Sequence, residues 1–482
     1  MTVTHLAAHP GRVPEFFLTV VGVILGLGAY SIVHLGVNGA LPDTFMVTAV
    51  VFAAAACAAH LAIRWAAPYA DPVLFPTALT LNGLGLAMIE RIDLDKGSSL
   101  WRSQGIFTMA GIACAILVVI VLRDHRILRR FTYTSLIISG ILLLLPLLPG
   151  LGKEIYGSRI WIYIAGYSFQ PAELAKIFLA IFFAGYLVVN RDNLALAGPK
   201  ILHLQFPRLR HFAPIMLAWA VCIGVLIFQK DLGTSILFFG LFVSMLYVAT
   251  DRLSWIVIGG LLALAGGFAA FQLFPHVTAR FNVWLNAMDP AVYEAQFGSY
   301  QVVQGNLGMA SGGLFGSGLG QGYPGIVPMS NSDFIISSIG EELGMAGVFA
   351  VLALYLVIVI RGLRSAAYVR DGFGKLLASG LSFTIALQVF VVIGGVTRLI
   401  PLTGLTLPLL AHGGSSLICN WIVIGLLLRI SDAARRPHVQ TSDALPPAWD
   451  DIAIDEDAPM GDDLAGEDSP GDRDDTQAME IR

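Results

Sequence analysis

Charged residues are scarce in this sequence. Of its 482 residues only 13% are Asp, Glu, Lys or Arg, whereas 56% are hydrophobic and the mean hydropathy is +0.75. A water-soluble domain of this length rarely has so few charges, because polar groups must cover its surface. The scarcity excludes an ordinary soluble enzyme and indicates a polytopic membrane protein.

Cysteine and clustered histidine are also scarce, and each absence excludes a class of site. The four cysteines all lie inside apolar runs, so we expect neither a disulfide framework nor a Cys-based metal site. The ten histidines are scattered without the spacing of metal ligands. No strand is predicted before Gly316-x-Gly318-x-Gly320, which excludes a nucleotide-binding loop. Nothing in the sequence indicates a nucleic-acid partner.

Apolar runs of about 20 residues, the length that crosses a hydrocarbon core, recur along the chain. The first is long enough to span and is followed by many similar runs, so we expect no cleavable signal peptide. The pattern predicts an all-α, polytopic membrane protein with about twelve transmembrane helices. The predicted spans are residues 16–37, 44–64, 72–90, 105–122, 134–151, 170–189, 212–229, 231–249, 254–274, 344–361, 376–396 and 405–428.

The distribution of basic residues predicts the orientation. With both termini in the cytoplasm, the inner loops hold fourteen Lys and Arg and the outer loops hold eight. The longest loop, residues 275–343, then lies outside. It has nine glycines between Gly305 and Gly325, which favour backbone held close to a partner or surface over regular structure. A flexible connector is the alternative, although Leu307 and Phe315 need burial or lipid.

Three regions are expected. Residues 1–71 hold the first two spans, residues 72–432 form a transmembrane core, and residues 433–482 form a tail. Residues 437–482 carry fourteen acids and two arginines. Such a composition cannot form a core, so we expect a disordered, acidic, cytoplasmic tail.

Ionisable residues at membrane depth or on its rim are costly, and they tend to be paired or functional. Glu173 and Lys176 stand three apart on one helix face, so they form either a local ion pair or a grip on a phosphate head group. Asp231 begins Asp-Leu-Gly-Thr, which favours a helix N-cap. Asp333 closes the glycine-rich stretch. It is either a second helix cap or a base, because a carboxylate near apolar surface can have a raised pKa.

Several short motifs follow one another in a fixed order. They are Gly157-Ser-Arg-Ile-Trp161-Ile, Phe169-Gln-Pro-Ala-Glu173-Leu-Ala-Lys176, Lys230-Asp231-Leu-Gly-Thr234, Tyr300-Gln301, Ser311-Gly-Gly-Leu-Phe-Gly316-Ser-Gly318-Leu-Gly320, Ser332-Asp333-Phe-Ile, Gly340-Glu-Glu-Leu-Gly344, Pro401-Leu-Thr-Gly-Leu-Thr-Leu-Pro408 and Gly413-Gly-Ser-Ser416. Through them, residues 75–432 resemble the SEDS family (shape, elongation, division and sporulation), whose RodA- and FtsW-like members are peptidoglycan glycosyltransferases.

This resemblance implies an enzyme that polymerises lipid II into glycan strands on the outer face of the bacterial cytoplasmic membrane. It implies that Asp333 is the catalytic base for the attacking sugar hydroxyl. Arg280, Lys176 and a divalent cation, Mg or Mn, are candidates for stabilising the diphosphate leaving group. The substrate-binding residues that it implies are Trp161, Glu173, Lys176, Asp231, Arg280, Gln301 and Ser416.

The sequence also departs from the family pattern. Ser332 stands where Thr is usual before the catalytic-loop Asp, and Ile160 stands where Arg usually precedes Trp161. Ala172 replaces a Ser, Ala411-His412 replace Ser-Tyr, and the acidic residue usual near Pro328-Met329 is missing. The first two spans exceed the ten usual for the family. Together with the short tail, they favour a role in elongation over one in division.

The resemblance further implies a class B penicillin-binding protein as the transpeptidase partner, together with other cell-wall machinery. Two alternatives belong to other classes of protein. A lipid II flippase would suit many spans with charges at membrane depth, but the proposed functional carboxylate lies on an outer loop. A non-catalytic scaffold of a cell-wall synthase would have no need of Asp333.

Overall fold

The computed structural model describes residues 12–155, 158–164, 166–195, 228–295 and 298–437, with short pieces at 200–201 and 204–205 and single residues at 220 and 224. The chain divides into two units, Met1–Arg436 and Pro437–Arg482. The acidic tail predicted from composition therefore lies outside the described residues, apart from its first few positions. Everything below concerns the first unit.

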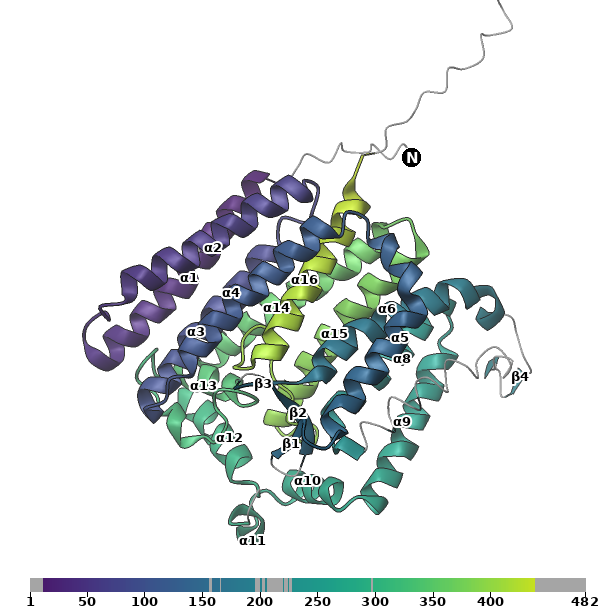
Figure 1. Cartoon of the computed structure of the whole chain (residues 1–482). Coiled ribbons are helices and arrows are strands. Elements are labelled where there is room, and N and C mark those ends of the chain that lie inside the picture. Colours follow the sequence, from purple (N-terminus) through teal and green to yellow (C-terminus); the bar gives the residue numbers. More distant parts are fainter. Residues whose placement is uncertain are drawn as a thin grey trace, which may run out of the picture. The chain divides into compact units, whose positions relative to one another are not determined.

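Long helices make up most of the described part of the chain, as an all-α membrane protein requires (Figure 1). Ten of them are long and apolar enough to cross a membrane. The long helices are α1 (Arg12–Asn38), α2 (Phe45–Ala66), α3 (Leu74–Lys96), α4 (Leu100–Val121), α5 (Thr132–Leu144, flanked by the 3-10 helices η1, His125–Phe131, and η2, Leu145–Leu147), α6 (Pro171–Ala195), α8 (Leu232–Thr250), α9 (Ser254–Leu273), α14 (Gly344–Tyr368), α15 (Gly372–Val396) and α16 (Gly414–Arg435).

Ten of the twelve predicted spans coincide with these ten helices, and two need comment. The span at 72–90 falls on α3, which carries more charge at its outer end than the other spans do. Its 23 residues reach about 35 Å, enough to cross a bilayer, and it packs along α1. Of the span at 212–229, the structure describes only residues 220, 224, 228 and 229.

One predicted boundary is wrong. The last span was expected to begin at residue 405, but α16 begins at Gly414, and residues 401–413 form an irregular segment. Apolar residues such as Leu407 and Leu410 are buried in that segment, so hydropathy alone could not separate it from the helix. We call residues 401–413 the outer segment.

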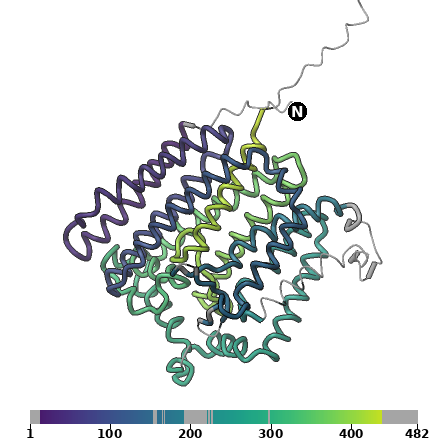
Figure 2. Tube along the Cα trace, viewed as in Figure 1, coloured from purple at the N-terminus to yellow at the C-terminus, as the bar shows by residue number. Residues whose placement is uncertain are grey.

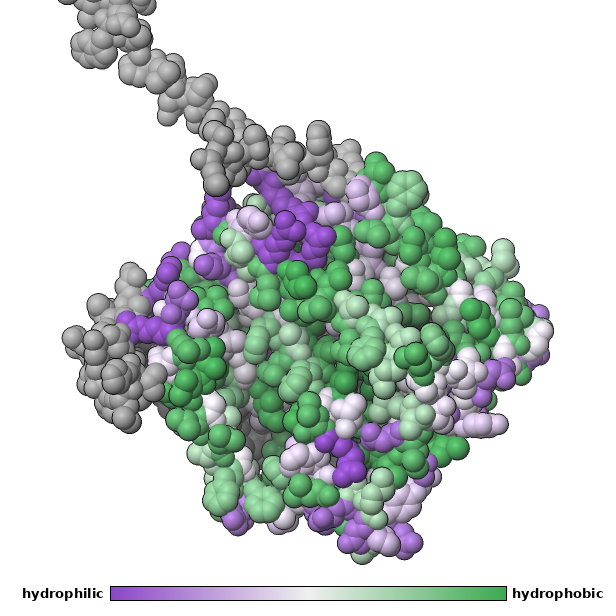
Figure 3. All heavy atoms as spheres, turned by 180° about the vertical axis from the view of Figure 1, so that it is seen from behind, coloured by the Kyte–Doolittle hydropathy of each residue, from purple (hydrophilic) through white to green (hydrophobic). Residues whose placement is uncertain are grey.

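The helices differ sharply in how much of them is buried. In α6 and α16, 78% of the apolar window is buried, and in α15 the share is 72%, whereas in α9 it is 6%. The three buried helices pack on one another and form the centre of the bundle (Figure 2). On the face shown in Figure 3, apolar side chains cover much of the middle, and polar residues gather toward the two ends. This distribution fits a hydrocarbon layer around the bundle.

One end of the bundle carries the connecting structure from which the site is built. An antiparallel sheet, β1 (Gly152–Ile155), β2 (Ser158–Ile164) and β3 (Tyr167–Phe169), precedes α6. After α9 come α10 (Pro275–Leu285), α11 (Pro290–Tyr293), α12 (Tyr300–Gly312), the 3-10 helix η3 (Pro324–Ile326) and α13 (Ile335–Glu342). The glycines up to Gly312 are therefore helical, contrary to expectation, and irregular backbone begins at Gly313, which has a φ of +56°. We call residues 313–327 the glycine-rich loop.

Candidate active site

Five separate segments meet around one small pocket at this end of the bundle. The pocket lies among strand β2, the start of α6, the turn before α8, helix α10 and the outer segment. Four residues singled out from the sequence line it: Trp161, Glu173, Asp231 and Arg280. Residues separated by more than a hundred positions are therefore brought together as the motifs predict.

Glu173 and Lys176 form the predicted ion pair on the first turns of α6. Lys176 Nζ lies 2.9 Å from Glu173 Oε2 and 3.0 Å from Gln388 Oε1 of α15. Gln388 Nε2 in turn donates to the carbonyl oxygen of Thr406, at 2.9 Å. Both charged side chains are buried. The pair therefore fixes α6, α15 and the outer segment to one another, and only Glu173 reaches the pocket wall.

Ser416 and Gln301 lie elsewhere. Ser416 is buried in the first turn of α16, where its hydroxyl is 3.3 Å from that of Thr406. It therefore supports the outer segment from behind the pocket wall. Gln301 is half-buried in the first turn of α12 and does not line the pocket.

Asp231 is the N-cap of α8, as its motif predicts. Its Oδ1 accepts from the backbone N–H of Thr234 at 3.0 Å, and its Oδ2 accepts from the Thr234 hydroxyl at 2.7 Å. Burial raises the pKa of Asp231, although the bonds from Thr234 and the charge of Arg280 act in the opposite direction. The carboxylate thus both caps the helix and lines the pocket.

Arg280 enters the pocket from α10. Its Nη1 donates to the carbonyl oxygens of Leu402 and Thr403, at 3.1 and 2.7 Å. Burial lowers the pKa of this guanidinium, and the carboxylates of Asp231 and Asp333 raise it again. The side chain is thus held by neutral oxygens, while its charge acts on two carboxylates.

Asp333 is not a helix cap. Helix α13 begins at Ile335, its N-cap residue is Phe334, and no side chain caps it. Asp333 Oδ1 accepts instead from the hydroxyl of Ser332, at 2.6 Å. Burial raises the pKa of Asp333, while the Ser332 hydroxyl and the charge of Arg280 lower it. Ser332 thus provides the hydroxyl that the usual Thr would provide at this position.

Gly404 was missed by sequence reasoning, and it joins the two charges. Its φ is +77°, a conformation that favours glycine. A Cβ at this position would lie 4.0 Å from both Arg280 Nη2 and Asp333 Oδ2. The guanidinium of Arg280 and the carboxylate of Asp333 therefore both lie close to the backbone of the outer segment at Gly404. The only available signal was a glycine inside the motif at 401–408.

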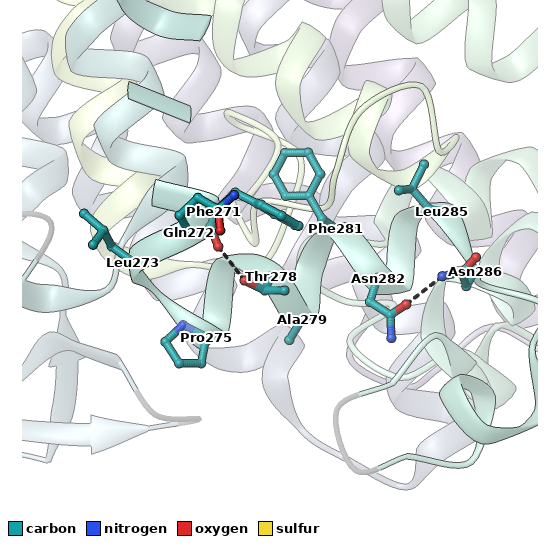
Figure 4. Close-up of a pocket in the computed structure, with 10 residues that line it drawn as sticks. All are labelled: Phe271, Gln272, Leu273, Pro275, Thr278, Ala279, Phe281, Asn282, Leu285 and Asn286. Atoms are coloured by element: carbon teal, nitrogen blue, oxygen red, sulfur yellow. Dashed lines mark hydrogen bonds between the residues drawn. The ribbon is translucent and has the colours of Figure 1, made fainter. Parts of the chain in front are cut away.

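A second, larger groove of about 700 Å³ lies beside the pocket and shares helix α10 with it. Figure 4 shows its lining, which comes from the end of α9 and from α10 and includes Phe271, Leu273, Phe281 and Leu285. None of its lining residues is charged. Six of its ten lining residues are apolar, and the others are Gln272, Thr278, Asn282 and Asn286. The groove can therefore take an apolar chain, and the charged pocket is the candidate for chemistry.

The next question is whether the site could hold a metal ion. Within the described ranges, no group of three or more His, Cys, Asp or Glu side chains is placed to hold a metal ion. Two carboxylates, Glu173 and Asp231, do face the pocket. Magnesium is commonly held by one or two carboxylates together with substrate phosphates, and the pocket offers that donor set.

The bundle and this rim site define a multi-pass membrane protein with an acid and a cation converging at one end. The FtsW/RodA/SpoVE family model, described as cell cycle protein, matches residues 73–436. The chain belongs to this family.

Named relatives and solved structures agree with that membership. Peptidoglycan glycosyltransferase RodA of Mycobacterium tuberculosis is 45% identical over 433 residues, covering 88% of this chain and 92% of the relative. The probable peptidoglycan glycosyltransferase FtsW of Geobacter metallireducens is 33% identical, covering 75% and 94%. A chain of a peptidoglycan synthase complex superposes with a TM-score of 0.62 at 26% identity, covering 76% and 99%. RodA of Thermus thermophilus gives 0.54, also at 26%, covering 76% and 98%.

Proposed function

We propose that this protein is a peptidoglycan glycosyltransferase that polymerises lipid II into glycan strands, with Asp333 as the general base. The observation that carries the proposal is that Arg280 and Gly404 line one pocket, and that a Cβ on Gly404 would lie 4.0 Å from both Arg280 Nη2 and Asp333 Oδ2. Asp333 itself lies next to this lining and not in it. The RodA relatives are more similar to this chain than the FtsW relatives described above. That difference favours a role in cell elongation and shape.

The reaction needs a proton acceptor and a stabiliser of negative charge. The acceptor sugar's hydroxyl oxygen forms a bond to the anomeric carbon of the donor, and its proton passes to Asp333. The bond from that carbon to the diphosphate oxygen breaks, and the prenyl diphosphate leaves with the electron pair. Arg280 faces the pocket and stabilises the charge that develops on the diphosphate.

A divalent cation would enter with the diphosphate, held by Glu173 and Asp231, and it would neutralise charge on the leaving group. The uncharged groove between the end of α9 and α10 would hold the prenyl chain. Helix α10 separates the two sites and carries Arg280, so the chain and the head group of one substrate can occupy them together.

The glycosyltransferase pocket must face the outer side, in agreement with the charge distribution. Single cysteines at Ser317 and at Ala367, both exposed, test this orientation in a background without the native cysteines. A membrane-impermeant thiol reagent applied to spheroplasts should label position 317 and spare position 367. The reverse pattern would overturn the orientation.

We also propose a class B penicillin-binding protein as the cross-linking partner. A structural relative at 26% identity is part of a complex that coordinates polymerization and crosslinking. Purification in mild detergent should recover such a transpeptidase with this chain. Its consistent absence would count against the proposal.

Polymer formation from purified protein and lipid II tests the function itself. Strands that lengthen with time in proteoliposomes, without any other protein, are the expected result. Movement of lipid II across the bilayer without strands would indicate a flippase. Neither strands nor movement would indicate a scaffold.

A further inference from the structure

The first two helices lie outside the family match, yet one of them reaches the loop that leads to Asp333. The match begins at residue 73, and α1 and α2 end before it. We propose that the outer end of α1 is a positioning element for the polymerisation reaction. It holds the glycine-rich loop and, through that loop, the segment carrying Asp333. This inference rests on the proposed function of Asp333.

The contact is between two backbones at Gly36 and Gly320. A Cβ on Gly36 would lie 2.6 Å from the carbonyl oxygen of Leu319 and 3.3 Å from the Cα of Gly320. Gly320 has a φ of +86°, and a Cβ there would lie 3.1 Å from the Cα of Gly36. Side-chain Nε2 of Gln321 also donates to the carbonyl oxygen of Gly36, at 3.1 Å. Only glycine at position 36 allows this approach.

The side chain of Leu319 strengthens the same contact. It packs against the small apolar cluster formed by Ala29, Tyr30 and Ala87. Within that cluster Tyr30 stacks on Trp101 of α4, with ring centroids 5.6 Å apart. The glycine-rich loop is thus docked on α1 by an apolar side chain as well as by its backbone.

α1 is itself fixed to the family core, so it can act as a support. Gly26 and Gly83 let α1 and α3 approach closely, since a Cβ on either would lie 3.0 Å from the other's Cα. Near the outer end, His34 Nε2 lies 3.0 Å from Glu90 Oε1 of α3. The next residue of α3, Arg91, donates to Glu342 and to the carbonyl oxygen of Gly322.

Glu342 connects the loop to the catalytic segment. Its carboxylate accepts from the backbone N–H groups of Gly320 and Gly322, at 2.9 and 3.3 Å. Glu342 is the last residue of α13, a helix that begins two residues after Asp333. A displacement of Gly320 away from Gly36 therefore removes a donor from α13 and loosens the element that sets the position of Asp333.

The test compares Gly36→Ala with Gly28→Ala in the same helix. A Cβ on Gly28 meets nothing within 4 Å, so this variant is a matched control. Alanine is the better helix former at both positions, so an effect of helix propensity would have the same direction in both. We expect Gly36→Ala to lower kcat about 10-fold to 10²-fold with KM unchanged, because small misplacements of reacting groups have effects of this size. Gly28→Ala should retain both values.

A second readout does not depend on activity. Backbone amides of residues 313–327 should exchange hydrogen faster in Gly36→Ala than in the wild type, and equally fast in Gly28→Ala and the wild type. Gln321→Ala and Leu319→Ala remove separate parts of the contact, and they decide the question if Gly36→Ala does not fold. Unchanged exchange and unchanged kcat in these variants would overturn the positioning role. A wild-type protein that makes no strands would instead refute the proposed function, while the exchange data would still test the contact.

Discussion

Two kinds of carboxylate lie at the same end of the bundle, the pair Glu341 and Glu342 and the single Asp333, and they differ in the groups that donate hydrogen bonds to them. Glu341 and Glu342 accept from backbone amides of the glycine-rich loop, and Glu342 also binds Arg91 at 2.7 Å. Asp333 accepts from its neighbour Ser332 and faces Arg280, whose own bonds go to carbonyl oxygens.

Burial raises the pKa of both Glu342 and Asp333, so a raised pKa does not tell the two groups apart. The donors do. A carboxylate whose two oxygens both accept from fixed N–H groups or an arginine, as in Glu342, would lose the bonds at whichever oxygen took a proton, so we infer that it stabilises the fold. Asp333 has only the Ser332 hydroxyl and its own backbone N–H as donors, and it lies near the cation Arg280. It can therefore accept a proton from substrate.

The largest change in stability is expected for Glu342→Gln. This substitution removes the closer carboxylate of the buried Arg91 and leaves only Asp95, at 3.9 Å, which lowers the free energy of unfolding by about 3 kcal/mol. Thermal unfolding in detergent measures it. Glu341→Gln is the control, because Glu341 accepts from the Tyr323 amide and should cost about 1 kcal/mol. Equal stability of Glu342→Gln and wild type would contradict the structural role of Glu342, on which its difference from Asp333 depends.

The next effect is on rate. Arg280→Gln removes the charge facing the pocket and should lower kcat about 10²-fold to 10³-fold, the cost of losing one stabilising donor. Its unfolding temperature should fall less than that of Glu342→Gln, because the hydrogen bonds of Arg280 go to neutral carbonyl oxygens and Asp231 keeps its bonds from Thr234. Arg280→Lys keeps the charge but loses the planar fork, and it should fall between. A fully active Arg280→Gln would remove this residue from the mechanism.

A smaller effect is a displaced pH profile. Because burial raises the pKa of Asp333, the acid limb of kcat/KM should lie above the ordinary value for Asp of about 3.9. Arg280 favours the ionised carboxylate, so Arg280→Gln should move the limb to higher pH. Initial rates of strand formation across pH measure this. A limb that stays in place would show that the two side chains do not interact.

Removal of the acidic tail, which contains none of these carboxylates, is expected to have no effect on activity. Residues 437–482 carry fourteen acids and two arginines, a composition unable to form a core. Truncation after Arg436 should leave polymerisation by purified protein unchanged, as a gel assay of strand length would show. A large loss of activity would reveal a contact between the tail and the body.

Much of the fold could be predicted because its signals are local. Apolar length locates the membrane helices, and Asp-Leu-Gly-Thr favours the cap at Asp231. The spacing of Glu173 and Lys176 gave their ion pair as one of two possible roles. The boundary at Gly414 was missed, because the buried outer segment is as apolar as a helix. The three short strands before α6 were not predicted, because residues 152–169, which include Lys153 and Arg159, were assigned only to an outer loop between two spans.

The distinction between the two groups of carboxylates could not be predicted, because it depends on distant partners. Arg91 and Glu342 are 251 positions apart, and no local pattern relates them. Whether Asp333 caps a helix depended on one residue, since α13 begins at Ile335 with Phe334 as its N-cap. The role of Gly404 depends on Arg280 and Asp333, two residues far from it in the sequence that both approach it in the fold.

The most direct test of the account measures strand formation and unfolding temperature together for purified Asp333→Asn. Loss of the base should lower the rate about 10²-fold to 10⁴-fold. Because burial disfavours the charged form of Asp333, the neutral amide should unfold at the wild-type temperature or above it at pH 7. Polymerisation at a near wild-type rate by the folded variant would contradict the account, and the base would then have to be sought at Asp231, Glu341 or Glu342.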